Sequence, residues 1–286
     1  MLYLLYKIGL FILRSVTDDV AYSIVSFCAR IKYSFSKKDR GLVTENLRNV
    51  IPEASNKKIS MLAAEVFKNF GKYLVDFFSL IKNQKDYLKN SVQLVGLENL
   101  DEALKSGKGC IVISGHLGNW ELGGCALANF GFKVNVIALA HHDPRINNLF
   151  TEQRKRAGIN SIPIGSARAA CQRALCRNEI VAILGDRPYG DRGIEVTFFG
   201  KTTIVPRGAA LLSLKNGSPI VLAFCYKEIT RKRLCKLVFE KPFQIKREGR
   251  LDKQLKDITQ IFINRFEYYI RKYPSQWYMF NKVWED

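Results

Sequence analysis

Negative charge is scarce in this sequence. Only 26 Asp and Glu residues stand against 45 Lys and Arg residues over 286 positions, which gives a formal net charge of +19. Such an excess is typical of proteins with an anionic partner, such as nucleic acid, phospholipid headgroups or an acidic carrier. Intrinsic disorder is excluded, because 47% of the residues are hydrophobic. Length and composition therefore predict a packed globular protein with an anionic partner.

Paired cysteines are also missing. The seven cysteines form no CxxC pair and no cluster with the spacing of a zinc site. Most lie in apolar runs, as Cys110 and Cys225 do, and their odd number without a signal peptide favours reduced thiols. We predict that they are small buried hydrophobic residues. The run His-His-Asp at 141–143 lacks a further ligand at suitable spacing, so it indicates a polar loop entering a helix, and we expect no metal.

No apolar run is long enough to cross a bilayer as a helix. The strongest run, residues 1–13, is interrupted by Lys7 and Gly9, and as a helix it would span about 20 Å of the ~30 Å hydrocarbon core. No small-residue cleavage site follows, as a secretory signal would require. We predict that residues 1–35 form an apolar helical segment lying in a membrane interface. An ordinary amphipathic packing helix is the alternative.

Positive charge gathers in one later stretch. Residues 227–256 contain 11 Lys and Arg residues against 4 Asp and Glu residues, including the run Arg231-Lys232-Arg233. Beside an apolar N-terminal helix, such a surplus favours adhesion to anionic lipid. No recognised nucleic-acid-binding motif is present, and the aromatic residues lie in apolar runs rather than between the basic ones. We therefore predict an anionic membrane surface as a partner, and no nucleic acid.

No repeat, low-complexity tract or long linker divides the chain, so we predict one domain over residues 36–286 behind the N-terminal segment. Helical apolar spacing extends through residue 82, after which short apolar runs alternate with amphipathic segments. The expected strands are Val92–Val95, Cys110–Ser114, Val134–Leu139, Ile180–Leu184, Ile194–Phe198, Ile220–Phe224 and Leu234–Phe239. The expected helices between and after them are 98–106, 119–129, 145–158, 166–177, 206–216 and 251–272. This order predicts an α/β fold with a mainly parallel or mixed central sheet flanked by helices, and sites at the carboxyl ends of its strands.

One loop at such a position carries an imidazole. The segment Ser-Gly-His-Leu-Gly-Asn-Trp-Glu, residues 114–121, follows an apolar strand, and Asn119 is suited to cap the next helix. His116 at the strand end and Glu121 in the first helical turn can then face one cleft. A carboxylate that orients an imidazole and stabilises its protonated form is what general-base catalysis requires. A histidine held only by structural hydrogen bonds is the alternative.

A second loop, Gly-Asp-Arg-Pro-Tyr-Gly at residues 185–190, follows the apolar run 180–184 and contains Asp186 and Arg187. Further along, Glu195 lies in an apolar stretch, where an unpaired charge would be costly. We expect Glu195 either to pair with His116 or to point outward from its strand.

The motifs GHLGNWE, GDRPYG and GIEVTFFG, together with the terminal PSQWYMF, resemble those of the lipid A biosynthesis (lauroyl/myristoyl) acyltransferase family. That family includes acyltransferases of phosphatidylinositol mannosides, and the similarity covers most of the chain. The H-x4-D/E pattern alone is shared with glycerolipid acyltransferases. The resemblance implies a membrane-associated enzyme that transfers a fatty acyl chain from acyl carrier protein or acyl-CoA to a hydroxyl of a glycolipid. It also implies the cytoplasmic face of the inner membrane, with no metal, no cofactor and no covalent acyl-enzyme.

The resemblance also suggests roles for single residues. His116 is expected to be the general base, with Glu121 and Glu195 as catalytic carboxylates. Arg154 is expected to stabilise the oxyanion or bind the acceptor phosphate. The loop at 186–187 departs from the Asp-Gln often seen in similar enzymes, so we expect these residues to bind substrate rather than to react. The expected substrate-binding residues are then Asn119, Arg154, Asp186 and Arg187.

A lipid A precursor is the acceptor we favour from the sequence. A phosphatidylinositol mannoside, an ornithine-type lipid or another glycolipid is the alternative within the same chemistry. A non-catalytic basic adaptor for membranes or nucleic acid is an alternative of a different class.

Overall fold

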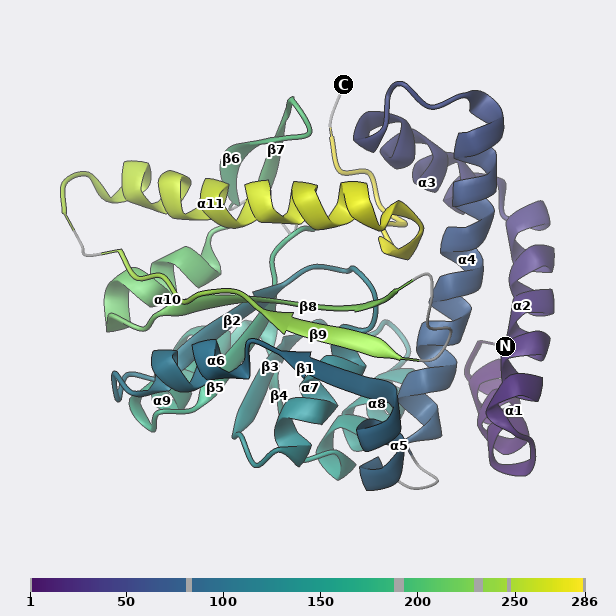
Figure 1. Cartoon of the computed structure of the whole chain (residues 1–286), viewed down its shortest axis with the longest axis horizontal. Helices are drawn as coiled ribbons and strands as arrows, with labels where there is room; N and C mark the ends of the chain where they lie inside the picture. The colour runs from purple at the N-terminus through teal and green to yellow at the C-terminus, as the bar shows by residue number, and fades with distance from the viewer. Residues whose placement is uncertain (1, 81–83, 188–192, 229–233, 246–247, 285–286) are drawn as a thin grey trace.

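The computed structural model describes residues 2–80, 84–187, 193–228, 234–245 and 248–284 (Figure 1). The basic run Arg231–Arg233 therefore lies outside the described residues. The first part of the chain is helical, as predicted, and its helices stand together at one end of the molecule. They are α1 (Leu2–Ser15), α2 (Asp18–Phe35), α3 (Lys37–Val50) and α4 (Asn56–Ser79).

A seven-stranded sheet forms the centre of the rest of the chain, in the order β1-β9-β8-β2-β5-β3-β4. All neighbouring strands are parallel except β8 and β9, so the sheet is mixed and mostly parallel, which confirms the predicted α/β architecture. The strands are β1 (Val92–Val95), β2 (Cys110–Ser114), β3 (Val134–Ala138), β4 (Ile159–Pro163), β5 (Ile180–Leu184), β8 (Ile220–Lys227) and β9 (Cys235–Phe239).

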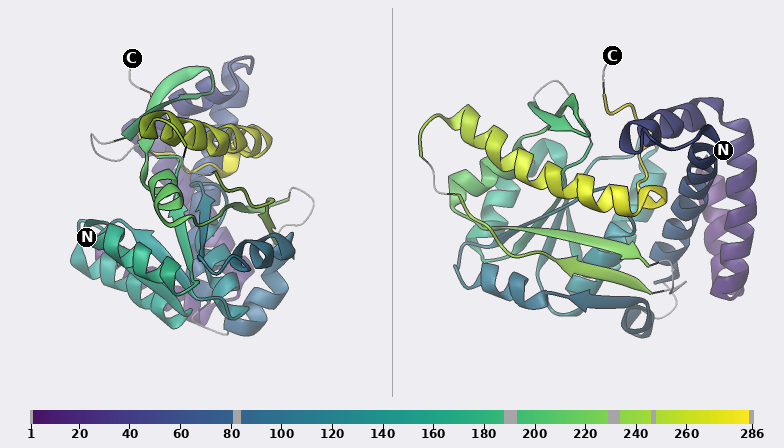
Figure 2. Two further views of the ribbon diagram at one scale, coloured as in Figure 1. Left: turned by 90° about the vertical axis from the view of Figure 1, so that its left-hand side faces the viewer. Right: turned by 45° about the horizontal axis from the view of Figure 1, so that its top comes forward.

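Helices cover both faces of the sheet (Figure 2). One hydrophobic core lies between the sheet and α9, α10 and α11, and the other lies between the sheet and α4, α6, α7 and α8. Because both faces are covered, the strands read as continuous apolar runs instead of alternating ones. These helices are α5 (Gln84–Ser91), α6 (Leu97–Leu104), α7 (Trp120–Asn129), α8 (Pro144–Arg156), α9 (Ala167–Cys176), α10 (Gly208–Asn216) and α11 (Leu251–Lys272).

The structure differs from the sequence prediction at three strands, β4, β6 and β7. The expected strand 194–198 does not join the central sheet: as β6 (Gly193–Phe198) it pairs with β7 (Lys201–Pro206) in a separate antiparallel hairpin beside α11 (Figure 1). Both β7 and β4 escaped prediction, because β7 alternates exposed and buried residues and β4 carries polar residues at its centre. The segment at 141–143 does enter a helix: the Asp143 side chain accepts a hydrogen bond from the backbone N–H of Arg145 and caps α8.

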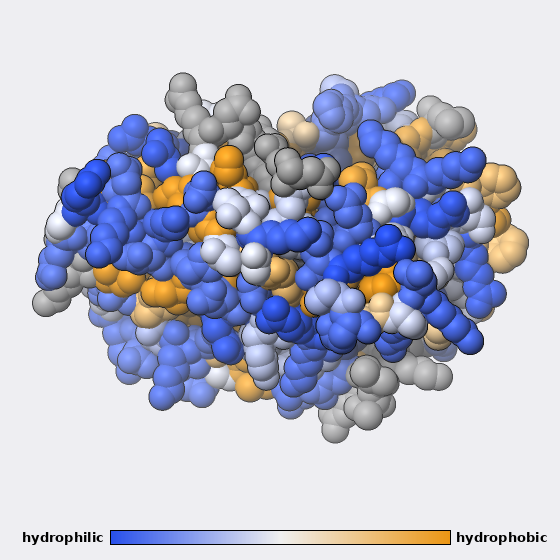
Figure 3. Space-filling model, turned by 90° about the horizontal axis from the view of Figure 1, so that it is seen from above, coloured by the Kyte–Doolittle hydropathy of each residue, from blue (hydrophilic) through white to orange (hydrophobic). Residues whose placement is uncertain are grey.

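The N-terminal helices present apolar side chains to solvent. We define the outer face of α1 and α2 by ten exposed large hydrophobic residues: Leu2, Leu4, Leu5, Ile8, Phe11, Val20, Ile24, Phe27, Ile31 and Phe35. In the space-filling view, hydrophobic residues also appear at the right-hand side of the molecule, where these helices lie (Figure 3). The opposite side of α2 packs closely on α4, where a Cβ at Gly71 would lie 2.8 Å from the Val25 side chain. Among the described residues, no helix combines the length and the apolar character needed to cross a membrane.

Candidate active site

The register of two neighbouring strands brings His116 and Asp186 together. In the parallel pair β2 and β5, Cys110 lies opposite Ile180 and Ser114 opposite Leu184. Two residues beyond the end of each strand, His116 Nδ1 lies 2.8 Å from Asp186 Oδ1. The backbone N–H of His116 also donates to Asp186 Oδ2 at 2.8 Å. The partner of the imidazole is thus Asp186, which we had expected only to bind substrate.

Asp186 is fully buried, whereas the His116 side chain is 20% exposed. A third hydrogen bond reaches the carboxylate from Trp277 Nε1, 2.9 Å from Oδ2. Burial by itself raises the pKa of Asp186, but the charge of His116 and the three hydrogen bonds outweigh burial and hold the pKa below its usual value. The carboxylate therefore stays ionised beside the imidazole. An ionised carboxylate can only accept hydrogen bonds, so Asp186 fixes the proton of a neutral His116 imidazole on Nδ1. The other ring nitrogen, Nε2, is then able to accept a proton.

The turn that carries His116 depends on a glycine and a cap. Gly118 has φ +67°, and a Cβ there would lie 2.0 Å from the carbonyl oxygen of Cys225, so only glycine fits. Asn119 caps α7, as predicted: its Oδ1 accepts from the backbone N–H of Leu122 at 3.0 Å. Asn119 is buried, and its side-chain amide points toward α4, where its Nδ2 lies 3.3 Å from Asp76 Oδ2.

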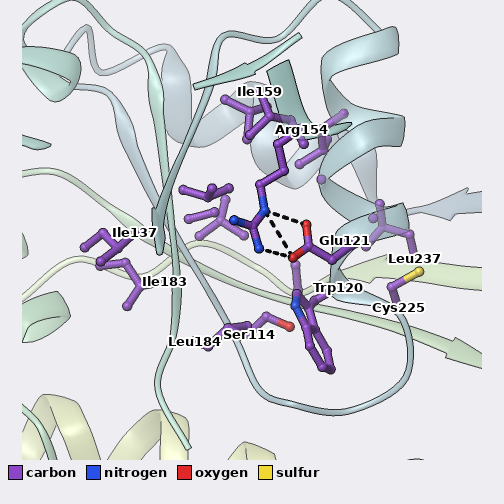
Figure 4. A pocket seen from close by; sticks show the side chains of 18 residues that line it. Ser114, Trp120, Glu121, Ile137, Arg154, Ile159, Ile183, Leu184, Cys225 and Leu237 are labelled. Carbon is purple, nitrogen blue, oxygen red and sulfur yellow. Dashed lines mark hydrogen bonds and ion pairs between the residues drawn. The ribbon is translucent and has the colours of Figure 1, made fainter. Parts of the chain in front are cut away.

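Glu121 is paired with Arg154 instead of His116. Arg154 Nε lies 3.1 and 3.0 Å from the two oxygens of Glu121, and its Nη2 also bonds to Oε1 (Figure 4). Both side chains are nearly buried. Burial lowers the pKa of Arg154, but the charge and hydrogen bonds of Glu121 outweigh it and raise that pKa. The structure thus brings Arg154 and Glu121 together, and it corrects the expectation that Glu121 would orient His116.

Glu195 lies away from His116. Its side chain is 66% exposed on β6, and its Oε1 is 3.8 Å from Lys256 Nζ. The expected pairing with His116 is therefore wrong, and the alternative of an outward-facing strand residue is correct. Arg187 follows Asp186, and its Nε is buried without a hydrogen-bond partner among the residues that the structure describes. The rest of that loop, residues 188–190, lies outside the description.

A cavity of about 100 Å³ lies between α7 and the sheet (Figure 4). Gly123 and Gly124 line it from α7: a Cβ at Gly123 would lie 3.2 Å from Cys225 Cβ, and one at Gly124 would lie 3.3 Å from Ile159 Cδ1. Its polar wall is the Glu121–Arg154 pair, and the other lining residues are Val112, Ser114, Trp120, Leu127, Val134, Val136, Ile137, Ile159, Ala182, Ile183, Leu184, Ala223, Cys225 and Leu237.

The cavity reaches the loop of His116. Ser114 and Trp120 both line it, and the rings of Trp120 and His116 are edge-to-face with centroids 5.1 Å apart. A small apolar cavity that begins beside an imidazole–carboxylate pair can hold a few carbon atoms of a hydrocarbon chain while a group attached to that chain reacts at the imidazole.

The sequence of the whole chain matches the model of a known protein family. Residues 1–286 match the family model of the bacterial lipid A biosynthesis acyltransferases. The chain belongs to this family. It is an acyltransferase, and the family's activity on lipid A and related molecules indicates acyl transfer to a glycolipid.

The chain is similar to two phosphatidylinositol mannoside acyltransferases. It is 26% identical to one from Mycobacterium tuberculosis (strain CDC 1551 / Oshkosh) over 251 residues, covering 84% of this chain and 75% of the relative. It is 23% identical to one from Mycolicibacterium smegmatis over 287 residues, covering 98% and 90%. A lipid A biosynthesis acyltransferase from Haemophilus influenzae is 21% identical over 166 residues, covering 58% and 52%.

Sequence reasoning missed three features of the site in this acyltransferase. It did not identify Asp186 as the hydrogen-bond partner of His116, because the sequence of the two loops does not reveal how the strands before them pair. It did not identify Trp277 as a hydrogen-bond donor to that carboxylate. The adjacent glycines at 123 and 124 were a usable indication of the cavity, since glycine within a helix costs stability and so has a packing or functional reason.

Proposed function

We propose that this acyltransferase moves a fatty acyl chain from a thioester, carried by acyl carrier protein or coenzyme A, to a hydroxyl of a glycolipid at a membrane surface. The observation that carries the proposal is the His116–Asp186 pair beside an apolar cavity in a chain of this family. A base that is oriented by a buried carboxylate suits the activation of a hydroxyl, and the cavity suits the hydrocarbon chain of the donor.

In the proposed mechanism, His116 Nε2 removes the proton from the acceptor hydroxyl as its oxygen attacks the thioester carbonyl. The new C–O bond gives a tetrahedral intermediate, and the C–S bond then breaks. The imidazolium returns its proton to the sulfur that leaves as a thiol, so the enzyme ends in its starting state. Asp186 acts by orienting the imidazole and stabilising its positive charge, and remains ionised throughout.

We assign the other residues to positioning and binding. The Glu121–Arg154 pair holds α7 to α8 along the cavity wall, which supports the space for the acyl chain. Arg187 is the proposed contact for the acceptor phosphate, because its buried Nε has no hydrogen-bond partner among the described residues and it follows Asp186 directly. For Asn119 we propose an indirect role, through the cap that fixes the His116 turn.

Two acceptors remain candidates. A lipid A precursor is the acceptor favoured from the sequence. A phosphatidylinositol mannoside is supported by a specific observation: the relatives that act on this lipid match 84–98% of the chain, whereas the lipid A relative matches 58%. Mass spectrometry of lipids from a strain lacking this protein distinguishes the two, because the lost species identifies the acceptor and its mass difference identifies the acyl chain.

For the membrane we propose an anionic lipid surface at the cytoplasmic face of the inner membrane. The outer face of α1 and α2 offers the apolar side chains, and exposed Lys7, Arg14 and Arg30 on the same helices offer positive charge for the headgroups. Deleting residues 2–14 is expected to weaken recovery with membranes while the rest of the fold remains. If the truncated protein still sediments fully with membranes at high salt, the anchoring role is wrong.

The test of function is an acyl-transfer assay with both donor types on a total lipid extract, read by mass spectrometry. Wild-type protein is expected to add one acyl chain to a glycolipid, and His116→Ala to lower the rate about 10²–10⁴-fold while folding and lipid binding are kept. A His116→Ala protein with near-normal turnover would overturn the mechanism. Tight duplex DNA binding that falls steeply with salt, without acyl transfer, would favour the basic adaptor instead.

A further inference from the structure

Besides Asp186 and Glu121, a third buried carboxylate lies outside the proposed active site. Asp76, on α4, is 2% exposed and contacts four side chains. Lys227 Nζ lies 2.8 Å from Oδ2, the hydroxyls of Tyr22 and Tyr87 bond to Oδ1, and Asn119 Nδ2 lies 3.3 Å from Oδ2. We call these five residues the Asp76 cluster. A buried charge needs such partners, because the loss of hydration would otherwise destabilise the fold.

The cluster connects the N-terminal helices with the turn of His116. Tyr22 belongs to α2, and Lys227 Nζ also lies 2.9 Å from its hydroxyl. Burial and the charge of Asp76 raise the pKa of Tyr22, so the hydroxyl keeps its proton and donates it to the carboxylate. At the other side of the carboxylate, Asn119 stands three residues after His116 and caps α7. Two hydrogen bonds therefore lead from α2 to the turn that carries the base.

A second series of hydrogen bonds connects Lys227, a member of the cluster, with the same turn through Gln276. The side chain of Gln276 forms two hydrogen bonds with the backbone of Lys227, at 2.9 and 2.7 Å. The backbone carbonyl of Gln276 accepts from the N–H of Gly118 at 2.8 Å. Asn119 thus belongs to the cluster itself, and its neighbour Gly118 is linked to the cluster through Gln276 and Lys227.

We propose that Asp76 is a positioning residue that couples the seating of α2 on a lipid surface to the geometry of the His116 turn. The inference rests on the membrane association proposed above. The exposed side chains of α2 and the inward Tyr22 belong to one rigid helix, so lipid binding at the outer face fixes the place of the Tyr22 hydroxyl. Through Asp76 and Asn119, that hydroxyl then favours the ordered turn and raises the turnover at His116.

The chain offers a matched control. Tyr22→Phe removes the hydroxyl that reaches Asp76, whereas Tyr33→Phe removes the hydroxyl by which the same helix bonds to Ser60, also on α4. Each change removes one tyrosine hydroxyl of α2 together with its two hydrogen-bond contacts, which for Tyr22 are with Asp76 and Lys227 and for Tyr33 are both with Ser60. Only the first change touches the cluster. Asn119→Ser interrupts the same series of hydrogen bonds at its other end. It removes the side-chain amide that contacts Asp76 and keeps an oxygen suited to cap α7.

The experiment is hydrogen exchange of residues 115–123 in the full chain, with and without vesicles of phosphatidylglycerol and phosphatidylethanolamine. We expect vesicles to slow exchange about fivefold in wild type and Tyr33→Phe, the change in an equilibrium that one net hydrogen bond produces. Neither Tyr22→Phe nor Asn119→Ser is expected to respond. With a glycolipid acceptor in the same vesicles, Tyr22→Phe is expected to lower kcat about fivefold at unchanged KM. Because Tyr22 and Asn119 act in the same path, the Tyr22→Phe/Asn119→Ser double variant is expected to be no slower than the slower of the two single variants.

Two outcomes overturn the coupling: no vesicle effect in wild type, or an equal effect in Tyr22→Phe and Tyr33→Phe. If either Tyr22→Phe or Asn119→Ser fails to fold, the other variant still tests whether the vesicle effect on hydrogen exchange depends on the cluster. Exchange needs no acyl transfer, so a protein that responds to vesicles but transfers no acyl chain would overturn the proposed function and leave the coupling standing.

Discussion

Replacing Asp186 by Asn changes the charge of one buried group and almost nothing of its size. The carboxylate accepts three hydrogen bonds, from His116 Nδ1, from the backbone of His116 and from Trp277 Nε1. An amide has one oxygen and one NH2 group, so it cannot accept at both ends. With its oxygen toward the two donors that face Oδ2, its NH2 faces Nδ1. The imidazole must then carry its proton on Nε2, where it can no longer accept one from a hydroxyl.

The expected loss of turnover is about 10⁴-fold, the size of the effect when an orienting carboxylate is made an amide in a Ser-His-Asp triad. This corresponds to about 5.5 kcal/mol of activation free energy. The change in stability has a pH signature. The folded pKa of Asp186 lies below its ordinary value, so its ionisation stabilises the fold above about pH 4, and this contribution is lost as the pH falls through the folded pKa. The Asn variant lacks that acid-side loss.

The measurements are acyl-transfer kinetics and the free energy of unfolding in urea between pH 3 and pH 8. Glu195→Gln is the matched control, because it removes a carboxylate that lies away from His116, is 66% exposed and is paired only with Lys256 among the described residues. It is expected to keep near-normal turnover and the acid dependence of wild type. Equal activity in Asp186→Asn and wild type, or a large loss in Glu195→Gln, would refute the assignment of Asp186 as the partner of His116.

Three further predictions concern the cavity, its wall and the thiols. Gly124→Ala adds a methyl group beside the cavity and is expected to lower kcat/KM for the longest accepted donor about fourfold per methylene displaced, measured with a series of acyl chain lengths. Arg154→Lys leaves Glu121 with fewer hydrogen bonds, so the free energy of unfolding is expected to fall by about 1–3 kcal/mol in urea titrations. Alkylation of the native protein at pH 8, followed by mass spectrometry, is expected to label Cys28 and Cys176 and spare the five buried cysteines.

The architecture was predictable from sequence because local signals agreed with it. The apolar runs of β2 and β8 are buried along almost their whole length, and that of β5 is buried over its first two residues. Such continuous apolar runs stand out against amphipathic helices without any knowledge of their neighbours. The last helix, α11, was predicted over the same residues, 251–272, since its apolar face repeats with helical spacing over its whole length. The hairpin of β6 and β7 was not predictable in the same way. Its place beside α11 is a tertiary contact that neither strand encodes alone.

The candidate site was predictable only in part, for a related reason. His116 was singled out by the glycines and the cap around it, which are local features. Glu121 was expected to be its partner because it is near in sequence, yet it lies in the first turn of α7 and reaches Arg154 on α8. Asp186 is 70 positions away and meets His116 because β2 and β5 pair with that same offset. Nearness in sequence misled here, and the register of two parallel strands decided the pair.

The C-terminal segment shows the same principle over a greater distance. Three consecutive residues hold the base and its surroundings: the carbonyl of Gln276 accepts from Gly118, the indole of Trp277 donates to Asp186, and the backbone N–H of Tyr278 donates to the carbonyl of His116 at 2.8 Å. Each of these contacts spans more than 90 positions of sequence. Residues 276–278 are therefore part of the support of the candidate site, and they explain in physical terms why the terminal PSQWYMF belongs with the GHLGNWE loop. The imidazole, its carboxylate and the turn between them can keep their geometry only when the end of the chain is folded against them.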